Sequence, residues 1–133
     1  MTEPVWQSSY SVGHEILDQQ HRKILVLCTR AIDCLESDGA EVDEQAHQIL
    51  NELKSYADLH FRTEEQVLSL CGYPGLAEQK AEHLEFSRRL TEMLYAATQG
   101  LIDKAAICVF LSGWWRGHIL ESDKQYSSFL ENK

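Results

Sequence analysis

The stretch Tyr56–Gln66, with the sequence YADLHFRTEEQ, decides both the fold and the chemistry expected of this chain. It places His60 and Glu64 four residues apart in a segment of helical pattern, so both side chains lie on one helical face. Steps of three and four residues extend that face through Ala46, Ile49, Leu53 and Tyr56 on one side and Val67 on the other. Burying an unpaired neutral polar group costs roughly 2–7 kcal/mol, and a charge costs more. The pattern therefore indicates a compensating partner, and a metal ion is the simplest one.

Length and composition predict one soluble domain spanning residues 1–133. The chain is 44% apolar and 25% charged, which is ordinary for a globular protein. Its net charge of −9 argues against nucleic acid and anionic membranes as partners. No apolar run approaches the ~20 residues that span a bilayer.

The cysteines and the N-terminus predict a reducing, cytoplasmic location. The opening residues MTEPVWQSSY have no basic start followed by an apolar run, so no signal peptide is expected. None of the four cysteines forms a CxxC pair, and buried free thiols are expected for the three that fall in helical segments among apolar neighbours. The four cysteines are Cys28, Cys34, Cys71 and Cys108.

Helical patterns cover most of the chain after an N-terminal arm at residues 1–17. Four helices are expected at about 18–37, 42–70, 76–98 and 103–130, with Asp18 as the N-cap of the first. Short connections between them predict an all-α fold, an up-down-up-down antiparallel four-helix bundle.

Four helices each place a polar residue on an apolar stripe. In an antiparallel bundle, the starts of the odd helices lie beside the ends of the even ones, so these residues share one layer. They are His21 on the first helix, His60 and Glu64 on the second, Gln79 and His83 on the third, and His118 and Asp123 on the fourth.

A metal centre explains this layer better than a hydrogen-bond network. One core histidine is usually hydrogen-bonded, but four histidines with two carboxylates would need a closed network without a metal. Imidazole and carboxylate without cysteine suit iron, manganese or zinc. Six ligands are too many for one tetrahedral zinc, and they fit two ions bridged by Glu64 and Asp123.

The spacing of these residues resembles the hemerythrin family in its single-domain bacterial form. The matching motifs are Asp18-Gln19-Gln20-His21, His60-x-x-x-Glu64, Gln79-x-x-x-His83 and His118-x-x-x-x-Asp123. The resemblance implies a non-haem di-iron centre that binds dioxygen reversibly, with an oxo or hydroxo group beside the bridging carboxylates.

The resemblance also assigns ligands to each iron. His21 and His60 would hold the oxygen-binding iron, while His83 and His118 would hold the other. The family has a further histidine on that second iron where this chain has Gln79, which we expect to be a weak or water-mediated ligand.

The same resemblance implies a ligand pocket, predicted here at Leu25, Phe61, Trp114 and Trp115. Trp115 stands where the family commonly has leucine, and it either narrows this pocket or only packs between helices. Three acidic residues beside the ligands in sequence, Glu65, Glu82 and Glu121, are expected to face water.

Two classes of function follow, and no catalytic residue is predicted. The first is carriage, storage or sensing of dioxygen or a related ligand such as nitric oxide, with a separate redox or signalling partner. The alternative is a di-iron oxidase, peroxidase or nitric oxide reductase that uses an open position at Gln79. An iron-storage or purely structural bundle is a third, weaker interpretation.

Overall fold

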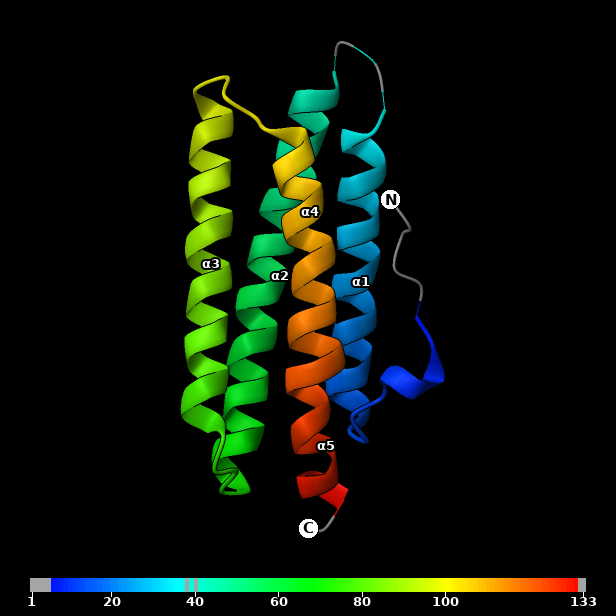
Figure 1. Cartoon of the computed structure of the whole chain (residues 1–133), viewed down its shortest axis with the longest axis vertical. Coiled ribbons are helices and arrows are strands. Elements are labelled where there is room, and N and C mark those ends of the chain that lie inside the picture. Colours follow the sequence, from blue (N-terminus) through cyan, green and yellow to red (C-terminus); the bar gives the residue numbers. More distant parts are fainter. Residues whose placement is uncertain (1–5, 38, 40, 132–133) are drawn as a thin grey trace.

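The computed structural model describes residues 6–37, 39 and 41–131. The chain folds into four long antiparallel helical rods (Figure 1). The rest of the predicted domain, residues 1–5, 38, 40 and 132–133, lies outside the described residues. The rods are α1 (Glu15–Leu35), α2 (Val42–Leu70), α3 (Leu76–Thr98) and a continuous fourth rod. That fourth rod comprises α4 (Lys104–Trp114), η2 (Trp115–Asp123) and α5 (Lys124–Glu131), and a short 3₁₀ turn, η1 (Ser8–Tyr10), precedes them all. The predicted all-α four-helix bundle is confirmed.

The first helix begins earlier than expected and has a different cap. His14 Nδ1 accepts a hydrogen bond from the Leu17 amide at 3.3 Å, which makes His14 the N-cap of α1. Asp18 instead lies inside the first turn, where its carboxylate accepts from the Val12 amide at 2.8 Å. The prediction of Asp18 as N-cap was therefore wrong, because this side chain ties the arm to the bundle.

The buried face of α2 is rotated slightly from the predicted stripe. Leu50, Ala57 and Leu68 are fully buried, whereas Ile49 and Tyr56 are only half-buried. From a shared anchor, a three-residue step falls about 60° short of a full turn and a four-residue step passes it by about 40°. The sequence pattern alone did not distinguish the two sets of positions. The packing of α2 against α1 and α3 buries Leu50 and Ala57 in place of Ile49 and Tyr56.

A π-helical segment, η2, interrupts the fourth rod at the polar layer. Side chains five residues apart diverge by about 140° on an α-helix, but a π-helix bonds i to i+5 and brings them together. His118 and Asp123 have this spacing and occupy η2. The sequence analysis expected one uniform helix at 103–130, although the five-residue gap was the available signal.

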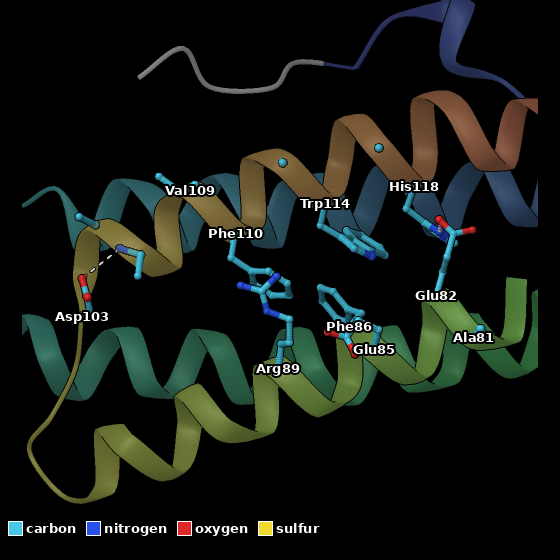
Figure 2. A pocket seen from close by; sticks show the side chains of 14 residues that line it. Ala81, Glu82, Glu85, Phe86, Arg89, Asp103, Val109, Phe110, Trp114 and His118 are labelled. Atoms are coloured by element: carbon cyan, nitrogen blue, oxygen red, sulfur yellow. Dashed lines mark hydrogen bonds and ion pairs between the residues drawn. The ribbon is translucent and has the colours of Figure 1, made fainter. Parts of the chain in front are cut away.

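The polar layer lies at the lower end of Figure 1, where α1 and α3 begin, α2 ends and η2 passes. Helix α1 packs closely against α2 and α4, and α2 packs against α3. A groove runs between α3 and α4 (Figure 2). None of the helices within the described ranges has the length and hydropathy needed to cross a bilayer.

Candidate metal centre

The structure brings the six predicted ligands together in a buried cluster. It contains two groups whose candidate ligand atoms lie within 4.8 Å of one another. The first group is His21, His60, Glu64 and Asp123, and the second is Glu64, His83 and His118. Each residue is at most 3% exposed. Glu64 belongs to both groups.

Glu64 divides its two oxygens between the two groups. Its Oε2 lies 3.3 Å from His21 Nε2 and 3.2 Å from His60 Nε2. Its Oε1 lies 2.8 Å from His83 Nε2 and 3.8 Å from His118 Nε2. A carboxylate in this position can bridge two cations, one beside each histidine pair.

Asp123, on η2, contacts one histidine of each pair. Its Oδ2 lies 3.1 Å from His21 Nε2, and its Oδ1 lies 3.2 Å from His118 Nε2. The π-helical turn is what permits both contacts, because it places Asp123 on the same face as His118. Two carboxylates therefore join the same two groups.

The outer nitrogens of three histidines contact polar residues of neighbouring helices. His60 Nδ1 lies 2.7 Å from Gln20 Oε1, and His83 Nδ1 lies 2.7 Å from Glu65 Oε2. On the fourth rod, His118 Nδ1 lies 3.4 Å from Glu82 Oε1. The hydrogen-bond partners of His60 and His83 fix the orientation of these rings and leave Nε2 free to bind a metal, whereas the contact of His118 with Glu82 is an ion pair without a hydrogen bond.

The prediction that Glu65 and Glu82 simply face water was wrong. Both keep part of their surface in solvent, but their carboxylates approach ligand histidines. Glu121 is exposed, as expected. Sequence reasoning missed Gln20, Glu65 and Glu82, although each directly neighbours a predicted ligand. Each of these side chains contacts a histidine on the next helix, so the pairing could be seen only once the packing of the helices was known.

Tyr126 supports the shared carboxylate from α5. Its hydroxyl donates a 2.7 Å hydrogen bond to Glu64 Oε2, and the side chain is fully buried. Burial and the nearby carboxylates raise the pKa of Tyr126 well above its usual value, so the hydroxyl stays protonated and remains a donor.

Electrostatics favour positive charge at two of the cluster's histidines, His21 and His118, whereas burial lowers the pKa of His60. Burial opposes charging of His21, but Asp123 and Glu64 outweigh it and raise its pKa to about 9. Burial likewise opposes charging of His118, but Asp123, Glu64 and Glu82 raise its pKa to about 10. Burial disfavours ionised Glu64, yet the surrounding histidines hold its pKa well below the usual value. The site therefore suits cations.

Several candidate ligand atoms also lack hydrogen bonds among the residues that the structure describes, so they are available to bind metal ions. Within residues 6–37, 39 and 41–131, several buried polar atoms lack a hydrogen-bond partner, among them His60 Nε2, His118 Nε2 and both Asp123 carboxylate oxygens. Buried polar atoms normally have partners. Imidazole and carboxylate donors suit iron, manganese or zinc.

Comparison with known proteins decides the family. The family model described as the hemerythrin HHE cation binding domain matches residues 12–130. The chain belongs to the hemerythrin family. The resemblance drawn from its four motifs is confirmed.

Relatives of this chain are similar to it along nearly its whole length. Bacteriohemerythrin from Clostridium acetobutylicum is 29% identical over 125 residues, covering 92% of this chain and 97% of the relative. Bacteriohemerythrin from Stenotrophomonas maltophilia is also 29% identical, covering 92% and 78% of the two chains. A crystal structure of wild-type hemerythrin superimposes with a TM-score of 0.85 at 22% identity, covering 96% of this chain and 97% of that one. The structural match shows the shared fold.

Gln79 is buried on the same face of α3 as His83, one turn nearer the start of the helix. Its Nε2 donates to the Ser122 carbonyl at 3.3 Å, next to Asp123 in sequence. Its Oε1 is buried and finds no hydrogen-bond donor in the described part of the chain. The predicted role of Gln79 as a weak or water-mediated ligand stays a prediction.

The four predicted pocket residues lie in different surroundings. Phe61 stacks on His83 with ring centroids 4.0 Å apart, and Trp114 stacks on His118 at 5.1 Å. Trp115 is buried in the main core, 6.1 Å from the Tyr10 ring of the arm, and Leu25 belongs to the same core. Trp114 lines the α3–α4 groove and Phe61 lines a hollow between α2 and α3; neither Leu25 nor Trp115 lines these.

Proposed function

We propose that this protein holds two iron ions and binds dioxygen, or a related small ligand such as nitric oxide, for carriage, storage or sensing. The observation that carries the proposal is the pair of buried donor groups joined through the split oxygens of Glu64 and Asp123. Iron bound there would supply the reversible redox chemistry that dioxygen binding needs.

The chain's own residues would hold and shield the two ions. His21 and His60 would bind one of them, and His83 and His118 the other. Stacking of Phe61 on His83 covers the second pair with an apolar ring. Tyr126 holds the Glu64 carboxylate in position through its hydrogen bond.

Metal analysis and rapid mixing test this proposal. Protein from iron-replete expression should contain about two irons per chain, and one zinc or no metal would contradict it. Reduced protein mixed with dioxygen in a stopped-flow instrument should give a long-lived spectral change that reverses when dioxygen is removed.

A di-iron enzyme of the oxidase, peroxidase or nitric oxide reductase type is the second candidate. It is favoured by the Gln79 carbonyl oxygen, which is buried without a donor among the residues described, where an imidazole ligand is expected in the family. Immediate and irreversible oxidation in the same mixing experiment, followed by repeated turnover with a reductant, would support this candidate instead.

Location and partners rest on the sequence. A cytoplasmic location for the protein is supported by its four cysteines, which are free thiols in the structure. The expectation that nucleic acid and membranes are not partners rests on the net charge of −9. A separate redox or signalling chain would supply electrons or receive the signal, and purification from the native host under reducing conditions tests for it.

A further inference from the structure

The orientation of the Gln79 amide is fixed by its single hydrogen bond. A peptide carbonyl only accepts hydrogen bonds, so the nitrogen of the amide must be the atom that faces the Ser122 oxygen. The other end of the amide, Oε1, must then point elsewhere. Gln79 is 2% exposed, so Oε1 points into the protein and not into solvent.

This oxygen is an acceptor without a donor. Nothing within residues 6–37, 39 and 41–131 donates to Oε1, although the atom is buried. A buried carbonyl left unpaired is unfavourable, and ordered water commonly supplies the missing bond. A small molecule that carries hydrogen is therefore expected beside it.

The surroundings of Gln79 link the second donor group to the surface. Gln79 precedes His83 by one helical turn, and its anchor Ser122 directly precedes Asp123. A hollow of about 410 Å³ lies between the start of α3 and the end of the fourth rod. Its lining includes Tyr73, Glu78, Gln79, Glu82, Ser122 and Gln125. Water and small ligands have a route to Gln79 there.

We propose that Gln79 determines which ligands bind at the His83–His118 half of the centre, by accepting a hydrogen bond from them. The carbonyl oxygen favours ligands that carry hydrogen, such as water and hydroxide. It disfavours ligands without hydrogen, such as azide and fluoride, because two acceptors then face each other. The inference rests on the proposed metal binding and names the ligand class of that site.

Azide titration of the iron-loaded protein tests the proposal. In the wild type, azide that binds at the His83–His118 half must displace a water molecule that is hydrogen-bonded to Gln79. Gln79→Leu and Gln79→Met remove the acceptor, and Met keeps nearly the shape of glutamine. At this half, each variant should bind azide about fivefold more tightly, since an ordinary hydrogen bond contributes about that factor, whereas azide binding at the His21–His60 half should not change. Gln125→Leu makes the same chemical change on an exposed residue of the same hollow and should leave azide affinity unchanged.

Iron release to a chelator, followed in parallel, separates this role from direct ligation. Under the proposal, the Gln79 variants release iron at the wild-type rate. Faster release would mean that Gln79 is itself a ligand and would overturn the proposal, as would unchanged azide affinity in both folded, iron-loaded variants. Those results leave the proposed function standing, whereas a wild-type protein that holds no iron overturns both.

Discussion

The metal cluster has two halves, the His21–His60 pair and the His83–His118 pair. They differ in the residues that contact the outer ring nitrogens of their histidines. In the first half, His60 contacts the neutral amide of Gln20. In the second half, His83 and His118 both contact carboxylates, at 2.7 and 3.4 Å. A carboxylate partner makes an imidazole a stronger donor than an amide does. The half that has Gln79 in place of an imidazole therefore has the more strongly supported histidines.

The halves also differ in their distance from solvent. His83 lines the hollow between α2 and α3, and His118 forms part of the α3–α4 groove, where Trp114 and Glu82 lie beside it (Figure 2). His21 and His60 are completely buried and line neither. The cluster therefore combines an enclosed half with a half whose histidines line surface hollows.

The largest expected effect comes from removing the link between the halves. Glu64→Ala deletes the carboxylate that faces all four histidines, so both ions should be lost, with less than half an iron per chain. Removing one partner from a buried charged cluster costs about 3–5 kcal/mol, so thermal unfolding should also move to lower temperature. Metal analysis and calorimetry measure the two effects, with exposed Glu121→Ala as the matched control. Full iron loading would show that the halves do not depend on Glu64.

A smaller effect, confined to the second half, is expected from Glu65→Gln. The change replaces the carboxylate behind His83 with an amide and so makes this half resemble the first. Loss of such a partner lowers metal affinity by roughly 10–100-fold. Competition with a chelator should show one ion of the two weakened, while exposed Glu78→Gln has no effect. Equal weakening of both ions would contradict the division into halves.

Gln79→His should strengthen iron binding in the second half, the opposite of the effect expected from Glu65→Gln. An imidazole at this position adds a stronger donor than an amide oxygen, so iron in the second half should leave more slowly. The change should also lengthen the lifetime of the oxygenated protein. Chelator release and spectral decay measure these rates, and a variant that matches the wild type in both would show that the position does not reach the metal.

The smallest effect concerns the cysteines, which lie outside both halves. Burial raises the pKa of Cys28 to about 12, so very little thiolate forms there at pH 8. Half-buried Cys71 should react with a thiol reagent in the native protein, whereas Cys28 should react only after unfolding. Peptide mapping after labelling distinguishes them. Titration in denaturant without reductant should count four thiols, and a count of two would contradict a reducing compartment.

The family and the helical bundle could be predicted from the sequence because the polar residues on the apolar helix faces occur at regular spacing. His60 and Glu64 had to share a face at four-residue spacing, as had Gln79 and His83, whatever the packing. The five-residue gap between His118 and Asp123 was read as part of an ordinary helix, and the π-helical turn of η2 was missed.

The sequence by itself determined the helices, their order and the residues that interrupt their apolar faces, since these depend on local periodicity. Only the tertiary structure decided which oxygen of Glu64 faces which histidine, and that Glu65 serves His83 and Glu82 serves His118. It also decided that Gln79 turns its carbonyl away from Ser122. These pairings join residues on different helices, so they depend on how each helix is rotated against its neighbour, and local periodicity carries no information about that rotation.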